Sequence, residues 1–260
     1  MKLPILIAAA TMALAGCQSD QSTLDLSKLN AEQKQEIGEI AGQYLSEHPE
    51  FLVQASKNLR EKAEQQQNNA MLKAAEAQQQ QLTQDPSSPF VGPADAKVTV
   101  VEFFDYQCIM CARAMPSVQK LIDENPDVKF VFKESPIFAQ RWEASKYAAE
   151  AGLWLYKSYG SEAYVKYHDG VFATGKNEGK LSIDDVNKQI KVAGGDISKF
   201  KPSNHYMDNL KLFQGLGLGG TPTLFFMPSK NAKADDIVVV PGLAPDRFEA
   251  AIEQVKKSVG

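Results

Sequence analysis

The sequence predicts an α/β fold in which a helical domain is inserted between two strand-containing halves, preceded by an N-terminal α-helical segment. Runs of β-branched and aromatic residues alternate with amphipathic stretches in the order β-α-β, then several helices, then β-β-α. A long polar stretch with helical periodicity comes before them. With 260 residues, the chain is long enough to bury one full core and carry an accessory segment.

Residues 1–17 have the features of an export signal. Lys2 supplies the positive charge, an apolar stretch follows, and Leu14-Ala15-Gly16-Cys17 forms a cleavage box. The apolar stretch is shorter than the ~20 residues of a spanning helix. The box is also the lipobox pattern of bacterial lipoproteins, in which the cysteine becomes the acylated first residue, so we predict lipidation of Cys17. Gln18 in place of aspartate favours the outer membrane as the anchor, and a plain signal peptide is the alternative.

A predicted tether over residues 18–29 leads into a predicted helical segment over residues 30–84. Asn30 is a good N-cap residue, and apolar residues then recur every three or four positions. His48-Pro49 ends the first helix, and Pro49 suits the first position of a second. The second helix is predicted to continue to about residue 83, because no glycine or proline interrupts it.

The apolar stripe of this segment is too sparse to make a globular core of its own. It must pack either against the following domain or against the same stripe of another subunit. We favour the second arrangement, a homo-oligomer formed through residues 30–83, and a glutamine-rich spacer is the remaining alternative. Asp85-Pro86-Ser87-Ser88-Pro89 then opens a predicted linker over residues 85–97.

The rest of the chain is predicted to form two halves, residues 98–139 and 216–260, separated by a helical insertion over residues 140–215. The expected elements are strand 98–104, helix 109–124, strand 128–133, helices within 140–214, strands 223–228 and 236–240, and helix 245–257. The right-handed crossover rule places the first two strands parallel. Aromatic residues of the insertion, including Trp154, Tyr164 and Tyr167, are interpreted as packing residues, with an aromatic-lined substrate groove as the alternative.

Cys108 and Cys111 follow the first strand directly and open the next helix. Two cysteines at this spacing can close a small disulfide and reopen it. The unpaired N–H groups and the dipole of the helix favour a thiolate on Cys108. A static disulfide constrains little chain over so short a loop, and a zinc site needs two more ligands. Because His48, His168 and His205 are scattered, we favour a redox pair over these two alternatives and predict no metal and no cofactor.

Two further motifs give the pair a family resemblance. Gly219-Gly220-Thr221-Pro222-Thr223 leads into an apolar run, and in thioredoxin-fold enzymes a threonine or valine precedes a cis-proline that lies against the C-x-x-C pair. Glu102-Phe103-Phe104-Asp105-Tyr106-Gln107-Cys108 resembles the entry strand of the DsbA family. Over about residues 90–258 the chain therefore resembles a DsbA-like thioredoxin-fold thiol–disulfide oxidoreductase, with an N-terminal helical oligomerisation extension. A trans proline in an ordinary turn is the alternative for Pro222.

The resemblance implies a division of roles in a thioredoxin fold. Cys108 is the attacking sulfur, expected to be exposed, and Cys111 resolves the mixed disulfide. The backbone at Thr221 pairs with an extended substrate strand, while Pro222 offers no N–H. Pairing through the backbone gives affinity with little sequence choice, which suits unfolded protein substrates.

The resemblance also gives roles to residues near the cysteines. Glu102 is expected to be buried beneath the pair, with a raised pKa, and to assist proton transfer to the buried cysteine. Lys129 or Lys133 is its expected partner, and a solvent-facing Glu102 is the alternative. Ile109 and Met110 are expected to contact substrate. They replace the proline–histidine pair of the best-known oxidising members, so we predict a reduction potential above that of thioredoxin and below those of the strongest oxidants.

The sequence thus predicts an envelope thiol–disulfide oxidoreductase that forms and/or isomerises disulfides in exported proteins. Its expected partners are unfolded or misoxidised exported proteins and a membrane redox protein. A net charge of −4 and a pI near 5.5 provide no basic surface for nucleic acid. The expected location is the bacterial periplasm, with an outer-membrane anchor on Cys17. The alternative function is a surface-anchored lipoprotein that acts as a chaperone or binding module.

Overall fold

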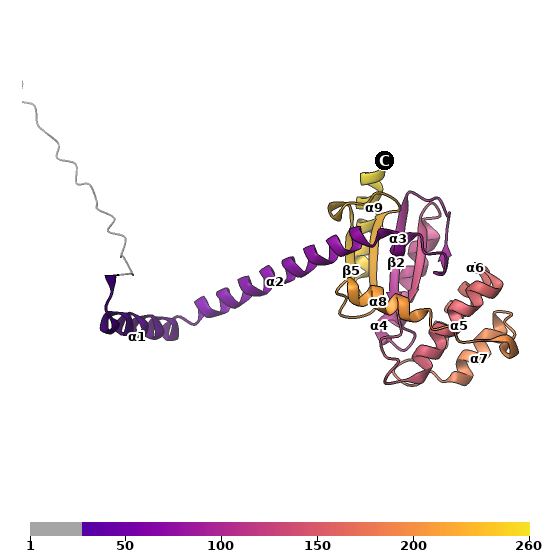
Figure 1. Cartoon of the computed structure of the whole chain (residues 1–260), viewed down its shortest axis with the longest axis horizontal. Helices are drawn as coiled ribbons and strands as arrows, with labels where there is room; N and C mark the ends of the chain where they lie inside the picture. The colour runs from indigo at the N-terminus through magenta and orange to yellow at the C-terminus, as the bar shows by residue number, and fades with distance from the viewer. Residues whose placement is uncertain (1–27) are drawn as a thin grey trace, which may run out of the picture. The chain divides into compact units, whose positions relative to one another are not determined.

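A computed structural model of the chain describes residues 28–260 (Figure 1). The helices are α1 (Ala31–Glu47), α2 (Glu50–Ala77), α3 (Gln79–Thr83), α4 (Ile109–Glu124), α5 (Glu143–Tyr159), α6 (Ser161–Ala173), α7 (Ile183–Val192), α8 (Tyr206–Gly215) and α9 (Phe248–Val259). The strands are β1 (Phe90–Val91), β2 (Val98–Phe104), β3 (Lys129–Glu134), β4 (Thr223–Pro228) and β5 (Val238–Pro241). Cys17, the predicted export signal and most of the predicted tether lie outside the described residues. No helix within residues 28–260 is long and apolar enough to cross a membrane.

The chain divides into two compact units between Leu59 and Arg60, inside α2. In the first unit, Asn30 caps α1 as predicted: its side chain accepts a hydrogen bond from the Gln33 N–H at 2.8 Å, and the Gln33 side chain accepts one from the Asn30 N–H at 3.0 Å. The rings of Tyr44 and Phe51 lie 5.7 Å apart around the junction with α2. Because α1 has no buried residue within one chain, this packing is local.

Large apolar side chains of the first unit remain exposed. Ile40 is 62% exposed and Leu59 is 69% exposed, and the other members of this set are Ile37, Tyr44, Phe51, Leu52 and Val53. These seven side chains form an apolar stripe that residues 28–260 of one chain leave exposed.

The second unit contains a five-stranded sheet with the strand order β1-β3-β2-β4-β5. Strands β2 and β3 pair in parallel, as the crossover rule predicted, and all other neighbours pair antiparallel. All seven residues of β2 are buried, which explains its unbroken apolar run. The predicted strands and the helix at 109–124 are confirmed to within two residues at each end.

Each face of the sheet is covered by helices. Val118 and Leu121 of α4 and Ile252 of α9 pack on one face, in a cluster with Val100 and Phe226. On the other face, Ala75 of α2, Leu82 of α3 and Phe213 of α8 pack in a cluster with Phe103 and Phe225. The reactive cysteines therefore lie on the α4 side, and the C-terminal part of α2 lies on the opposite side.

Helices α5, α6 and α7 form a separate layer, which Figure 1 shows gathered to one side of the sheet. Trp154, Tyr164 and Tyr167 are buried in the cluster that joins this layer to Phe104 and Phe132 at the ends of β2 and β3. These aromatic residues are therefore packing residues, as predicted, and do not line an open groove.

Two short elements differ from the prediction. The helix expected to continue to residue 83 ends at Ala77, and α3 follows from Gln79, where Leu82 turns into the core. The predicted linker contains β1, which adds an antiparallel edge strand to β3. Its two residues are too few to show a strand periodicity in the sequence.

Candidate active site

The turn between β2 and α4 holds Cys108 at the first position of the helix. Cys108 is the N-cap of α4, and its carbonyl oxygen accepts a hydrogen bond from the Ala112 N–H at 3.1 Å. The Cys108 N–H donates to the Asp105 carbonyl oxygen at 3.0 Å. The Cys108 sulfur therefore lies where the unpaired N–H groups of a helix N-terminus stabilise negative charge.

The carboxylate of Asp105 fixes this turn to neighbouring segments. It accepts hydrogen bonds from the Gln107 N–H at 2.8 Å, the Phe138 N–H at 2.9 Å and the Ser145 hydroxyl at 2.8 Å. Burial raises the pKa of Asp105, and these hydrogen bonds oppose the rise. No role was predicted for Asp105, although a polar residue directly after a buried strand is a signal that could have identified it.

The Thr221–Pro222 peptide bond is cis, as predicted. In its protonated form, the Cys108 thiol donates a hydrogen bond to the Thr221 carbonyl oxygen at 3.2 Å. The Pro222 carbonyl oxygen in turn accepts a hydrogen bond from the Gly242 N–H at 2.8 Å, which holds the loop against β5. The two sequence motifs, although distant along the chain, therefore meet at Cys108.

The two cysteine sulfurs differ in acidity. A hydrogen bond from Cys111 lowers the pKa of Cys108 to about 6, against the opposing effect of burial, and the N–H groups of Cys111 and Met110 also contribute. Burial and the neighbouring Cys108 raise the pKa of Cys111 well above its ordinary value. With these pKa shifts, Cys108 is mainly a thiolate at neutral pH, whereas Cys111 stays a thiol.

The expected exposure of Cys108 is wrong. Cys108 is only 6% exposed, compared with 1% for Cys111, because the loop carrying Thr221 lies over it. Ile109 and Met110, in the first turn of α4, are both half-buried. Met110 packs against the cluster that includes Phe104 and Tyr106.

Glu102 is buried on the α4 side of the sheet. Burial raises its pKa to about 8, and its Oε2 atom has no hydrogen-bond partner within residues 28–260. The prediction of a buried Glu102 with a raised pKa is confirmed.

The prediction of a lysine partner for Glu102 is wrong. Side chains alternate along a strand, and Glu102 lies opposite Phe132 in the register, so Lys129 and Lys133 extend from the other face. Lys133 donates to the Gln81 carbonyl at 2.7 Å, to Ser88 at 2.6 Å and to Asp85 at 3.0 Å. Lys129 donates to the Thr83 carbonyl at 2.9 Å. Both lysines therefore hold the chain between α3 and β1.

A second buried acid, Glu134, lies at the end of β3. Its Oε1 atom accepts hydrogen bonds from the hydroxyls of Tyr106 at 2.9 Å and Tyr164 at 3.1 Å. Burial raises the pKa of Glu134 well above its ordinary value, and the nearby acids Asp105 and Glu102 contribute to the rise. No role was predicted for Glu134. Within residues 28–260 no group of three or more His, Cys, Asp or Glu side chains is placed to hold a metal ion.

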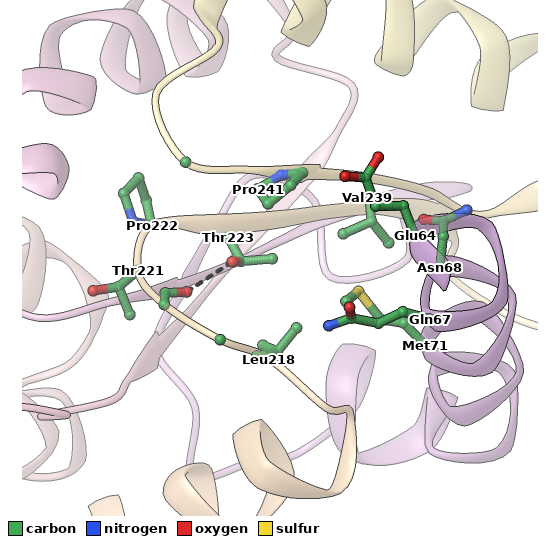
Figure 2. Close-up of a pocket in the computed structure, with 13 residues that line it drawn as sticks. Glu64, Gln67, Asn68, Met71, Leu218, Thr221, Pro222, Thr223, Val239 and Pro241 are labelled. Atoms are coloured by element: carbon green, nitrogen blue, oxygen red, sulfur yellow. Dashed lines mark hydrogen bonds between the residues drawn. The ribbon is translucent and has the colours of Figure 1, made fainter. Parts of the chain in front are cut away.

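A pocket of about 400 Å³ adjoins Thr221 and Pro222 (Figure 2). Its walls come from α2, from the loop at residues 218–222, and from β4 and β5. Figure 2 shows the α2 residues on one side of the pocket and Thr221 and Pro222 on the other. The reactive sulfur and this pocket therefore share the Thr221–Pro222 loop.

Comparison with known families places this site in context. Residues 84–246 match a family model described as thioredoxin. The chain belongs to the thioredoxin family. Residues 33–66, which cover most of α1 and the start of α2, match the N-terminal domain of copper resistance protein ScsC. These two matches agree with the predicted thioredoxin fold and with the predicted N-terminal helical extension.

Solved structures resemble this thioredoxin-family chain over most of its length. BcfH from Salmonella enterica Typhimurium is 36% identical, with a TM-score of 0.75, over 86% of this chain and 96% of that chain. ScsC from Proteus mirabilis in a transitional conformation is 26% identical, with a TM-score of 0.59, over 88% of this chain and 100% of that chain. The thiol–disulfide exchange protein DsbA2 from Wolbachia pipientis is 22% identical, with a TM-score of 0.59, and shares the fold.

Curated relatives match a shorter region. A Na⁺/H⁺ antiporter NhaA 3 from Salinispora tropica is 29% identical in an alignment of 157 residues that covers 54% of this chain. A second antiporter, NhaA 1 from Salinispora arenicola, is 27% identical over 157 residues. The chain spans 22% of the length of these two proteins.

Proposed function

We propose that this thioredoxin-family protein is an envelope thiol–disulfide oxidoreductase that forms and/or isomerises disulfides in exported proteins through Cys108 and Cys111. The observation that carries the proposal is the pairing of an acidic Cys108, with a pKa of about 6, and a buried Cys111 thiol at one helix N-terminus. The thiolate is the nucleophile and the better leaving group, so the sulfur with the lower pKa is the one that exchanges with substrate.

In the oxidised protein, a substrate thiolate attacks the Cys108 sulfur. A bond forms between the substrate sulfur and Cys108, the Cys108–Cys111 bond breaks, and Cys111 leaves as a thiolate that takes up a proton. A second substrate thiolate then displaces Cys108. The substrate gains one disulfide and the protein gains two electrons, so a separate redox protein must reoxidise it. In isomerisation the Cys108 thiolate attacks a substrate disulfide first and is displaced later.

Glu102 is proposed to assist the proton transfer at Cys111. Burial raises its pKa to about 8, so at neutral pH the carboxyl group is largely protonated and can donate a proton to the leaving thiolate. We assign this function to Glu102 without the help of a lysine side chain. Lys129 and Lys133 extend from the opposite face of the sheet and hydrogen-bond to the backbone of α3.

The protein is proposed to act in the bacterial periplasm, anchored to the outer membrane through acylated Cys17, and to assemble as a homo-oligomer through residues 30–83. The match of residues 33–66 to the ScsC N-terminal domain and the exposed apolar stripe of the first unit support the assembly. An oligomer places several Cys108 sites around a shared space, an arrangement suited to isomerisation of large substrates.

Refolding of a scrambled-disulfide substrate and reduction of insulin test the function directly. The Cys108→Ala variant should lose both activities, and Cys111→Ser should accumulate mixed disulfides with substrate because the resolving sulfur is absent. Equilibration of the purified protein with glutathione gives its reduction potential, expected between those of thioredoxin and the strongest oxidants. Full refolding activity in Cys108→Ala would instead support a chaperone or binding module.

A further inference from the structure

The pocket beside the active site is built partly by the N-terminal extension. Glu64, Gln67, Asn68 and Met71 of α2 form one wall, and the opposite wall is the loop that carries Thr221 and Pro222 (Figure 2). All of these residues lie in the second compact unit, from Arg60 to Gly260. The pocket is therefore complete within one chain.

The C-terminal half of α2 is fixed firmly enough to form a wall. Ala75 is fully buried, and Met71 and Leu72 pack against the same cluster of the sheet. The Glu76 carboxylate accepts a hydrogen bond from the Ala234 N–H at 2.9 Å, and Gln79 donates to the Pro228 carbonyl at 2.8 Å. These contacts hold the end of α2 beside the pocket and set the position of Gln67 and Met71.

The pocket and the reactive sulfur both adjoin the Thr221–Pro222 loop. Thr221 lines the pocket, and its carbonyl oxygen accepts the hydrogen bond of the Cys108 thiol at 3.2 Å. A polypeptide whose sulfur is bonded to Cys108 therefore lies next to the Thr221–Pro222 loop and can extend across it. The residues beside its cysteine then enter the space between that loop and α2.

The size of the pocket suits a short extended peptide. From Glu64 to Met71, α2 rises by about 10 Å. An extended chain rises by about 3.3 Å per residue, so roughly three residues fit along this wall.

The chemistry of the walls selects among peptides. Met71, Leu218 and Val239 provide apolar surface, whereas Glu64 and the amides of Gln67 and Asn68 are exposed. Within residues 28–260, none of these three polar side chains makes a hydrogen bond or ion pair with another residue. They are available to an incoming ligand.

We propose that α2 forms a substrate subsite that recognises the residues flanking a substrate cysteine. The ligand is an extended peptide with an apolar side chain on Met71 and Leu218 and a lysine or arginine toward Glu64. This inference rests on the proposed redox function, because the ligand is identified from the Thr221–Pro222 loop that the pocket shares with Cys108. It gives the N-terminal extension a role in substrate choice, in addition to assembly.

The test measures how fast the oxidised full-length protein is reduced by two kinds of dithiol. One is a peptide with two cysteines flanked by leucine and lysine, and the other is dithiothreitol, which has no flanking residues to occupy the pocket. Figure 2 shows the Gln67 side chain extending toward the pocket, so Gln67→Trp should block it. The matched control is Gln66→Trp, at a neighbouring exposed position of α2 that does not line the pocket.

The expected result is a fall of about tenfold in the rate with the peptide for Gln67→Trp, corresponding to about 1.4 kcal/mol of lost binding. The dithiothreitol rate, the Gln66→Trp rates and the native mass should not change. In addition, Glu64→Lys should reverse the preference between a peptide carrying lysine and one carrying glutamate.

An equal fall with both dithiols, or no fall with either, would overturn the subsite while leaving the redox function intact. A changed native mass in Gln67→Trp would also overturn it, because the pocket would then be a contact between subunits. If the wild-type protein fails to react with either dithiol, the proposed redox function itself is wrong.

Discussion

The acidity of Cys108 depends on its neighbour as well as on the helix. The hydrogen bond from Cys111 is the largest influence that lowers its pKa to about 6. A hydrogen bond to a charged group contributes about 1.5–3 kcal/mol, so its loss should raise the Cys108 pKa by about one unit or more. We therefore predict that Cys111→Ala moves the midpoint of Cys108 alkylation by iodoacetamide from about pH 6 to above pH 7. Cys111→Ser keeps a hydroxyl donor and should shift it less, whereas equal midpoints in all three proteins would contradict this account.

Glu102 should make the stability of the folded protein depend on pH. Burial raises its pKa from 4.5 to about 8, so the folded state keeps a proton that the unfolded chain releases. The free energy of unfolding therefore falls as pH rises from about 4.5 to about 8. Glu102→Gln removes this titration. Between pH 4.5 and pH 8, the free energy of unfolding of the variant should therefore rise relative to that of the wild type, by at most about 5 kcal/mol.

Urea unfolding of both oxidised proteins at pH 5 and pH 8 measures the effect of Glu102 without the thiol titrations. If the free energy of unfolding changes equally with pH in the two proteins, Glu102 does not keep a proton in the folded state. In the same preparation, Glu102→Gln should slow the release of Cys111 from the disulfide if Glu102 is its proton donor.

At the residue scale, sequence patterns located the cysteines, the cis Thr221–Pro222 bond and the buried Glu102. The sequence patterns gave the wrong partner for Glu102. A shift of one residue in the pairing of two strands moves a side chain to the other face of the sheet, and the sequence does not fix this pairing. The patterns also missed Glu134, whose hydrogen bonds come from Tyr106 and Tyr164, and the second of these belongs to the inserted helices. Contacts made across an insertion leave no periodic signal in the sequence.

At the scale of elements, the link between α3 and β1 depends on one buried cation. Lys133 is 1% exposed and lies 3.0 Å from the Asp85 carboxylate. Burial would raise the pKa of Asp85, but the Lys133 ammonium and the hydrogen bonds with Ser87 lower it to about 2. The stabilisation is therefore fully present above about pH 4 and is lost as pH falls through about 2.

We predict that Asp85→Asn lowers the free energy of unfolding at pH 7 by about 2–3 kcal/mol, because it leaves the Lys133 charge buried without a counterion. Asp95→Asn, at an exposed position of the same linker, is the matched control and should have little effect. The double variant Asp85→Asn, Lys133→Met should recover much of the loss, since it removes the unpaired charge. Equal free energies of unfolding for Asp85→Asn and the wild type in urea would show that the ion pair does not stabilise the fold.

The sequence could not predict these elements fully. The stretch from residue 50 to residue 83 lacks glycine and proline, so periodicity alone indicated one helix. The break after Ala77 is instead a consequence of tertiary packing, because Leu82 and Thr83 are both buried against the sheet. Strand β1 was missed for a related reason, since its pairing with β3 is set by a neighbour and not by its own two residues.

At the scale of the whole molecule, assembly should depend on the exposed stripe of the first unit. Ile40 is 62% exposed and Leu59 is 69% exposed, and burying each such side chain between subunits contributes about 1.5–3 kcal/mol. We predict that Ile40→Glu and Leu59→Glu together shift the native mass measured by sedimentation to that of a monomer. Urea unfolding of the second unit should not change. Gln66→Glu serves as the charge control, and an oligomer that survives both substitutions would show that the contact lies elsewhere.

The structure also decides where the extension can be shortened without damage. Deletion of residues 18–88 would remove Ala75 and Leu82, which are completely buried in the core of the second unit. A deletion that ends at Leu59 leaves these contacts intact and separates assembly from folding.

One carboxylate gives the molecule a mechanical property. Asp105 joins the turn before Cys108 to the Phe138 backbone and to Ser145 in the first turn of α5. These hydrogen bonds link the turn that carries the Cys108 sulfur to the start of the helical layer. A force applied to the start of α5 is therefore transmitted through Asp105 to the turn that carries Cys108.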